Sequence, residues 1–107
     1  MAEWLGEFEQ VVLFAVAQID EAYGATIREE IERRTGRQVS AGAIYTTLDR
    51  LEARGLLASW WGEPTPERGG KRKRHFKLKP AGREALERSW QAMRAMARGF
   101  DSKAVKS

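Results

Sequence analysis

The sequence predicts a mainly α-helical fold with one small β-hairpin (α+β), and three observations lead to this expectation. In four segments, apolar residues recur at spacings of three and four, which is typical of helices that bury one side. Between the third and fourth segments lie two short runs with the residue pattern of β-strands. The stretch that joins them, EPTPERGG (63–70), holds two prolines and two glycines, so it predicts the loop of a hairpin.

The first expected helix covers residues 4–19 and is apolar on more than one side. Its main stripe consists of Leu5, Phe8, Val12, Ala15, Val16 and Ile19, and three apolar residues lie off that stripe, namely Val11, Leu13 and Phe14. A helix of this kind must be covered on more than one side. We therefore expect protein to pack against two of its sides.

Two further helices have recognisable start and stop signals. The second is expected to begin at Tyr23 or Gly24 and to end at Gly36, a residue type that often follows the last helical turn. The third is expected to follow Ser40, a favourable N-cap, and to end at Gly55. The residues expected to be buried are Ile27 and Ile31 in the second helix and Ile44, Leu48 and Leu51 in the third.

The two predicted strands are LLASWWG (56–62) and KRKRHFKLK (71–79). In the second strand, odd positions are lysine or histidine, whereas even positions end in Phe76 and Leu78. One face of this strand is therefore basic, and the other becomes apolar toward its end. Of Trp60 and Trp61 in the first strand, we expect one in the core and the other partly exposed.

The fourth helix is expected to begin at Pro80, because proline is favoured in the first helical turn. Its apolar residues step in a heptad-like seam consisting of Leu86, Trp90, Met93, Ala97 and Phe100. These assignments divide the chain into a body of residues 1–79, a single C-terminal helix of residues 80–100 and a flexible tail of residues 101–107.

Positive charge is concentrated in the predicted hairpin. The 107 residues include 19 Lys and Arg against 15 Asp and Glu. Between positions 68 and 79 there are seven cations and no anion, whereas acidic residues outnumber basic ones in the rest of the chain. A cationic block on an otherwise slightly acidic chain indicates a localised site for a polyanion. The alternatives are a site for another anion and a solvated edge strand that resists aggregation.

Three helices followed by a hairpin form the layout of a winged helix-turn-helix. In that layout the third helix, about residues 40–54, enters the major groove of DNA, and the wing, about residues 62–75, lies on the backbone or in the minor groove. Cations beside a loop gain binding free energy by displacing counterions from phosphates. The predicted DNA contacts are Ser40, Gly42, Ala43, Tyr45, Thr46, Thr47 and Arg50 in the helix and Arg68, Gly69, Gly70, Lys71, Arg72, Lys73 and Arg74 in the wing.

The residues also carry a family resemblance. The segment YG at 23–24, the pattern SxGxIYxxLxRLExxGLL at 40–57, the Gly-rich wing and FKLKPAG at 76–82 resemble the PadR family of bacterial transcriptional regulators, in particular its short subgroup with one C-terminal helix. Thr46 and Lys79 stand where many members have proline and threonine. The resemblance implies a homodimeric repressor, and some members respond to phenolic acids, drugs or other aromatic compounds.

The apolar surfaces of the first and last helices independently favour a homodimer. A body of this size cannot cover both the second side of the first helix and the C-terminal seam, and soluble monomers avoid large apolar patches. The residues expected at the dimer interface are Trp4, Leu5, Phe8, Leu86, Trp90, Met93, Ala97 and Phe100. Trp90, Met93 and Met96 are also candidates for an effector pocket, although such stripes more often form plain core.

The sequence offers no support for catalysis, a cofactor or a metal site. It has no cysteine, its one histidine, His75, lies in the basic strand away from carboxylates, and its glutamate cluster at 29–32 lacks metal-ligand partners. No apolar run approaches the length of a membrane span, and the N-terminus is acidic. We expect a bacterial cytoplasmic protein that associates with the nucleoid when bound to double-stranded DNA. The alternative function is a winged-helix module that binds protein and no DNA.

Overall fold

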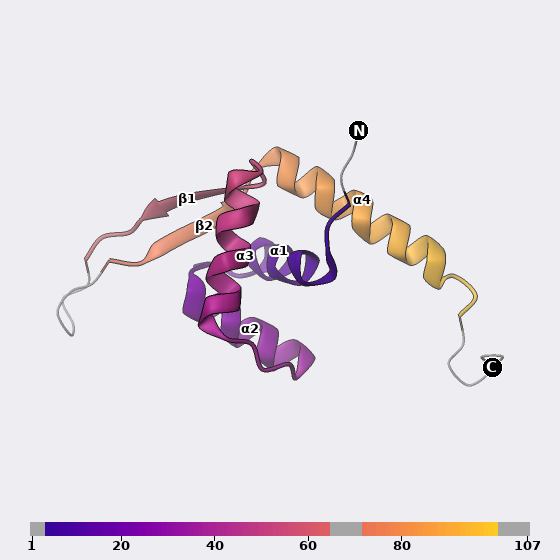
Figure 1. The fold of residues 1–107 in the computed structure, drawn as a ribbon, viewed down its shortest axis with the longest axis horizontal. Helices are drawn as coiled ribbons and strands as arrows, with labels where there is room; N and C mark the ends of the chain where they lie inside the picture. The colour runs from indigo at the N-terminus through magenta and orange to yellow at the C-terminus, as the bar shows by residue number, and fades with distance from the viewer. Residues whose placement is uncertain (1–3, 65–71, 101–107) are drawn as a thin grey trace.

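The computed structural model describes residues 4–64 and 72–100, and within these ranges it contains four helices and a two-stranded antiparallel hairpin (Figure 1). The elements are α1 (Glu7–Gln18), α2 (Gly24–Thr35), α3 (Ala41–Ala53), β1 (Leu57–Trp61), β2 (Arg74–Leu78) and α4 (Pro80–Ala97). The predicted fold class, mainly α with one hairpin in the order of a winged helix, is confirmed. The predicted tail, residues 101–107, lies outside the described residues.

Local capping signals set the ends of the helices. Gly36 follows α2 with φ of +75°, and Gly55 follows α3 with φ of +78°, a left-handed conformation that glycine adopts without steric cost. At the start of α3, the Ser40 hydroxyl accepts a hydrogen bond of 3.0 Å from the backbone N–H of Ala43. The predicted caps are therefore confirmed. The first helix begins at Glu7, three residues later than predicted.

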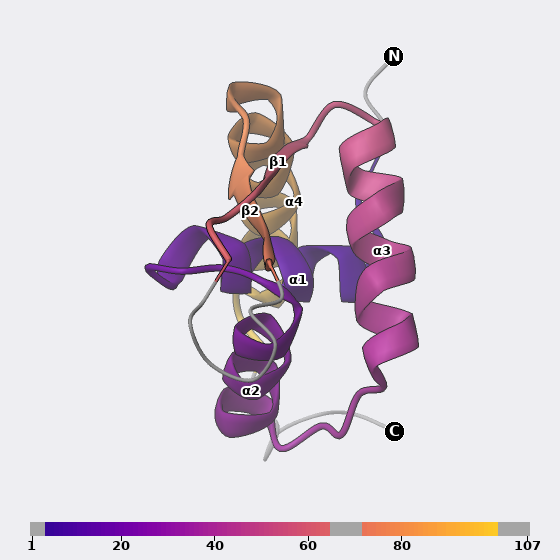
Figure 2. The same cartoon turned by 90° about the vertical axis from the view of Figure 1, so that its left-hand side faces the viewer.

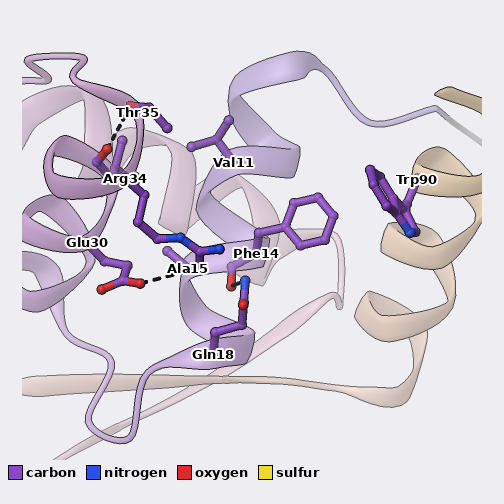
Figure 3. Close-up of a pocket in the computed structure, with 9 residues that line it drawn as sticks. Val11, Phe14, Ala15, Gln18, Glu30, Arg34, Thr35 and Trp90 are labelled. Atoms are coloured by element: carbon purple, nitrogen blue, oxygen red, sulfur yellow. Dashed lines mark hydrogen bonds and ion pairs between the residues drawn. The ribbon is translucent and has the colours of Figure 1, made fainter. Parts of the chain in front are cut away.

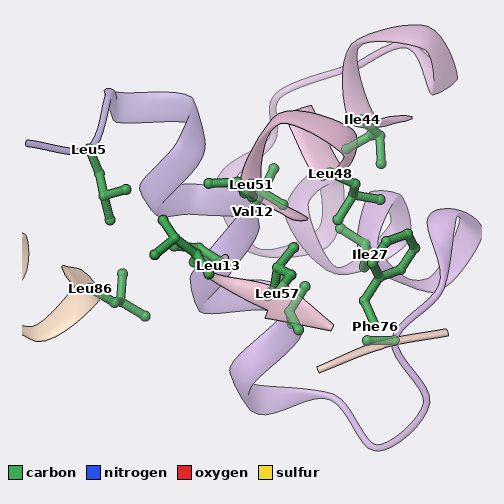
Figure 4. Close-up of a cluster of buried hydrophobic side chains, with 14 of the residues drawn as sticks. Leu5, Val12, Leu13, Ile27, Ile44, Leu48, Leu51, Leu57, Phe76 and Leu86 are labelled. Carbon is green, nitrogen blue, oxygen red and sulfur yellow. The ribbon is translucent and has the colours of Figure 1, made fainter. Parts of the chain in front are cut away.

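The hydrophobic core is formed by residues from one side of each helix and from the inner face of the hairpin (Figure 4). It includes Val12, Leu13, Ile27, Ile31, Ile44, Leu48, Leu51, Leu57, Phe76 and Leu86. Helix α1 contacts α2, α3, β2 and α4, so its own chain covers it on more than one side. For this reason Leu13, which lies off the main stripe, is fully buried.

The register of the hairpin sorts its residues onto two faces. Leu57, Ser59 and Trp61 pair with Leu78, Phe76 and Arg74, and these six residues share the face that turns toward the core and α3. Ala58 and Trp60 pair with Lys77 and His75 on the opposite face. The hairpin extends away from the helical body on one side, and the end of α4 extends on the other (Figures 1 and 2).

Helix α4 joins the core through its first half only. Gly82, Ala85 and Leu86 are buried, whereas the side chains beyond Trp90 are largely exposed. A Cβ atom at Gly82 would overlap the carbonyl oxygen of Leu56, so the lack of a side chain lets α4 pack directly on the chain that enters β1. In the described part of the chain, α4 and the other helices are all too short or too polar to cross a bilayer.

The contact at Gly82 predicts a large effect from a small substitution. We expect Gly82→Ala to lower the free energy of unfolding by about 1–3 kcal/mol, because the overlapping atom belongs to the backbone and cannot move aside as a side chain could. The measurement is urea unfolding followed by circular dichroism at fixed protein concentration. Gly42→Ala is the control, since its new methyl group would meet only the Ser40 hydroxyl, at an ordinary contact distance of 4.0 Å, and should leave stability unchanged or raise it by about 0.5 kcal/mol. Equal stability of the two variants would contradict the packing described for α4.

Candidate nucleic-acid interface

Helix α3 presents an exposed face on the side opposite its buried stripe. Ile44, Leu48 and Leu51 point into the core at spacings of four and three. This surface includes the exposed residues Ser40, Gly42, Ala43, Tyr45, Thr46, Asp49 and Arg50, and it is called the reading face below. Its first turn carries only small side chains, so the backbone there can approach another molecule closely.

Tyr45 is held in place by the start of α2. A Cβ atom at Gly24 would overlap the Tyr45 hydroxyl, so the ring fits over the second helix only because residue 24 has no side chain. The ring is still partly exposed as part of the reading face. Gly24 therefore sets how closely the two helices of the helix-turn-helix approach each other at this point.

The prediction that Thr47 belongs to the DNA-contacting residues is wrong. Its side chain is only 5% exposed. Residue 47 lies three positions after Ile44 and four before Leu51, so it falls on the buried side of the helix and is not available to a ligand. The remaining helix residues predicted as contacts all lie on the reading face.

The described part of the wing carries two exposed cations near its tip. The Arg72 guanidinium donates to the carbonyl oxygen of Gly62 at 3.0 Å. The Lys73 ammonium lies 4.7 Å from the centre of the Tyr23 ring and 3.5 Å from its hydroxyl. Four further predicted contacts, Arg68, Gly69, Gly70 and Lys71, lie outside the described residues.

Arg74 differs from its neighbours, because it is paired within the chain. Its guanidinium donates to Asp49 Oδ1 at 3.0 Å, to Glu52 Oε1 and to the Ser59 hydroxyl at 3.2 Å. Glu52 also accepts a hydrogen bond of 2.5 Å from Ser59. The cationic block described for positions 68–79 is therefore partly neutralised at Arg74, since α3 supplies two carboxylates. Even-numbered position 74 shares a face with Phe76, so the strand pattern could have indicated that its side chain turns toward the helix.

The charges around Arg74 keep it ionised. Partial burial lowers the pKa of Arg74, but its hydrogen bonds and its proximity to Asp49 and Glu52 outweigh burial, so the pKa lies above its usual value. On the other flank of α3, Arg50 Nη1 lies 3.8 Å from a Glu9 carboxylate oxygen, and Arg54 Nη1 lies 3.2 Å from the same atom. Acidic residues thus tie α3 to the wing and to α1.

The outer face of the hairpin carries a stack of rings. The His75 imidazole lies 5.5 Å from the Trp60 ring with an interplanar angle of 17°, and the Tyr23 ring meets it edge-on at 5.5 Å. Trp60 and Trp61 are both exposed, at 47% and 59%. The prediction that one of the two tryptophans lies in the core is wrong, because the outer half of the hairpin extends beyond the helical body.

The residues predicted for a dimer interface fall into two groups. Leu5 and Leu86 are buried against their own chain, each only 6% exposed, so they have little surface left for a partner, and the prediction for these two is corrected. Leu86 lies on the side of α4 that faces the core, and Leu5 precedes α1 and packs into the same core. The others remain exposed or half-buried, namely Trp4, Phe8, Trp90, Met93, Ala97 and Phe100.

A crevice of about 450 Å³ opens between α1, α2 and Trp90 of α4 (Figure 3). The Phe14 ring meets the Trp90 ring edge-on, with 5.8 Å between their centres, and Glu30 and Arg34 lie at the opposite end. A hydrogen bond from Arg33 lowers the pKa of Glu30. Of the three candidate effector residues, only Trp90 lines this crevice, whereas Met93 and Met96 are exposed further along α4.

The described ranges, 4–64 and 72–100, contain no group of three or more histidine, cysteine or acidic residues placed to hold a metal ion. The chemistry that the interface offers consists of hydrogen-bond donors, cations and exposed aromatic rings. Such a surface can bind a polyanion in a defined orientation.

Comparison with known proteins finds matches to this chain among regulators of transcription. A family model described as the transcriptional regulator PadR-like family matches residues 12–88. The transcriptional regulator Rv3488 of Mycobacterium tuberculosis is 40% identical over 81 residues, which cover 74% of this chain and 69% of that protein. A 37.1 kDa protein of transposon TN4556 from Streptomyces fradiae is 39% identical over 95 residues, and although the match covers 88% of this chain, the chain spans only 25% of that relative.

The fold has close counterparts among solved structures. A PadR-like transcriptional regulator from Bacillus cereus superposes with a TM-score of 0.71 at 22% sequence identity, and the match covers 85% of this chain and 84% of that one. Similarity at this level of identity shows that the winged-helix fold is shared.

The pairing of Arg74 predicts that two neighbouring arginines differ in their effect on stability. We expect Arg74→Ala to lower the free energy of unfolding by about 1 kcal/mol, because it leaves two carboxylates of α3 without their partner in a partly exposed site. Arg72→Ala, its matched control, should change stability by less than about 0.5 kcal/mol, since Arg72 is exposed. Urea unfolding of both variants tests this, and an equal loss in the two would contradict the structural role of Arg74.

Proposed function

The chain belongs to the PadR-like family of transcriptional regulators, and from this premise we propose that it binds duplex DNA as a homodimer and represses transcription at its site. In this proposal α3 enters the major groove and the wing lies on the adjacent backbone and minor groove. The observation that carries the proposal is the continuity of the reading face with the basic wing through the Arg74–Asp49 pair. Residues 1–79 form the DNA-binding unit, and α4 mediates dimerisation.

Individual side chains on the reading face suit different contacts with DNA. Thr46 can place its methyl group against a thymine and its hydroxyl against a phosphate or base edge. Arg50 can donate to a guanine or a phosphate, because its ion pair with Glu9 is long and half-exposed. Arg72 and Lys73 supply charge to the backbone contact, which does not depend on base sequence.

The exposed apolar residues of α4 support the homodimer. Trp90 and Met93 on α4 are 45% and 57% exposed, and Phe100, just beyond the end of α4, is 67% exposed. A second copy of the chain is the partner that would cover them symmetrically. The crevice beside Phe14 offers a concave surface for the second α4. Two copies would double the DNA contacts and present two reading helices to a pseudo-palindromic site.

A small aromatic effector fits the same region. Trp90, Met93 and Met96 form an adaptable apolar surface on α4. A ring bound among them would alter the packing of the two copies and therefore the distance between the reading helices. This provides a physical route by which an effector would release the DNA.

Selection of genomic DNA fragments by the purified protein tests the proposal. We expect enrichment of a pseudo-palindromic site whose half-sites lie about one helical turn apart. If each subunit neutralises about three to four phosphates, the slope of log affinity against log salt concentration should be roughly −5 to −7. Absence of duplex binding even at low salt would refute the proposal and favour a winged-helix module that binds protein.

The homodimer predicts the effect of a charge on α4. Met93→Glu should convert the protein to a species with the mass of one 12.1 kDa chain and should weaken its DNA binding together with dimerisation. Met93 is exposed, so the substitution should leave the fold intact. Gln91→Glu places the same charge on the opposite side of α4 and serves as the control. Analytical ultracentrifugation of the two variants decides the matter, and a Met93→Glu protein that remains dimeric would show that α4 does not form the interface.

A further inference from the structure

Trp61 is a large apolar side chain that the fold leaves uncovered. It is the last residue of β1 and is 59% exposed. In the described part of the chain, no ring or cation lies against its indole, whereas the neighbouring Trp60 stacks on His75 and has the Lys77 ammonium 6.0 Å from its ring centre. Exposed indole surface of this kind is enriched where proteins bind partners.

The position of Trp61 connects it to the reading face. Trp61 pairs directly with Arg74, so the two side chains stand next to each other on the same face of the hairpin. Arg74 in turn donates to Asp49 on the reading face at 3.0 Å. The indole therefore neighbours the arginine that binds α3, whereas Trp60 lies on the opposite face of the hairpin.

The charge around Trp61 indicates which partner it meets. Arg72 and Lys73 follow across the hairpin and are exposed, so the outer end of the wing is cationic, with the Lys73 ammonium itself against the Tyr23 ring. A polyanion is attracted to this surface, and duplex DNA combines phosphates with apolar deoxyribose along each groove. Indole matches that combination, because its ring is apolar and its N–H can donate to a phosphate oxygen.

We propose that Trp61 contacts DNA directly, with its ring against the deoxyribose at the edge of the minor groove that flanks the segment read by α3. The inference rests on the proposed function and adds to it a contact that does not depend on charge. Apolar side chains that bind along the minor groove are sensitive to its width. Trp61 therefore makes the wing responsive to the shape of the DNA beside the half-site.

The test compares alanine variants of the two adjacent tryptophans. Affinity for the duplex enriched in the genomic selection is measured by fluorescence anisotropy over a range of salt concentrations. Trp61→Ala should weaken binding roughly five- to twentyfold and leave the salt slope unchanged, because no charge is removed. Trp60→Ala should bind within about twofold of the original protein. Arg72→Ala should weaken binding and also make the slope shallower by about one per subunit.

Intrinsic fluorescence provides a readout that does not require the alanine variant to fold. The emission change on adding the duplex should be lost in Trp61→Phe and kept in Trp60→Phe. Wild-type affinity of Trp61→Ala, or an unchanged emission response in Trp61→Phe, would overturn this inference and leave the proposed function standing. Failure of the unaltered protein to bind any duplex would instead overturn the proposed function, and this inference with it.

Discussion

Arg74 of β2 binds two carboxylates of α3, Asp49 and Glu52, so the hairpin and the reading helix are joined by side chains as well as by the chain that connects them. In the proposed function both elements face the same duplex, so their relative orientation decides which contacts can form together. The tie is partly exposed, and its contribution to stability is modest. Its main consequence is positional, because it holds the outer wing beside the reading face. The same pair places Asp49, the acidic residue of that face, next to a cation, which in the proposed function would moderate its repulsion of phosphate.

Much of the fold could be predicted from local signals in the sequence. Stripes of apolar residues, the N-cap Ser40 and the left-handed glycines at 36 and 55 act within one or two helical turns, so each is legible without knowledge of the rest of the chain. The exposed side of α3 could be predicted from the same kind of signal, since it is the side opposite the apolar residues Ile44 and Leu48. Its one error, Thr47, concerns a residue at the border between two sides of a helix, where the width of the buried side depends on tertiary packing.

The features that escaped prediction depend on how elements meet. The carboxylate partners of Arg74 lie 22 and 25 positions earlier in the sequence, so no local charge count could reveal them. Leu86 belongs to a regular seam, but α4 crosses α1 such that this residue enters the core and Trp90 marks the point where the helix leaves it. The exposure of both tryptophans of β1 follows from how far the hairpin extends beyond the helices, which the composition of a strand does not determine.

The fit of Tyr45 over Gly24 has a consequence for how such a protein can vary. A side chain at position 24 would displace the Tyr45 ring, and a smaller residue at 45 would leave a gap over α2. The two positions therefore constrain each other, and a substitution at one preserves the packing only with a compensating substitution at the other. Because Tyr45 belongs to the reading face, such a paired exchange would also change the shape of that face. Under the proposed function, relatives that differ at this pair would then present a differently shaped surface to DNA even where the other exposed residues of α3 are the same.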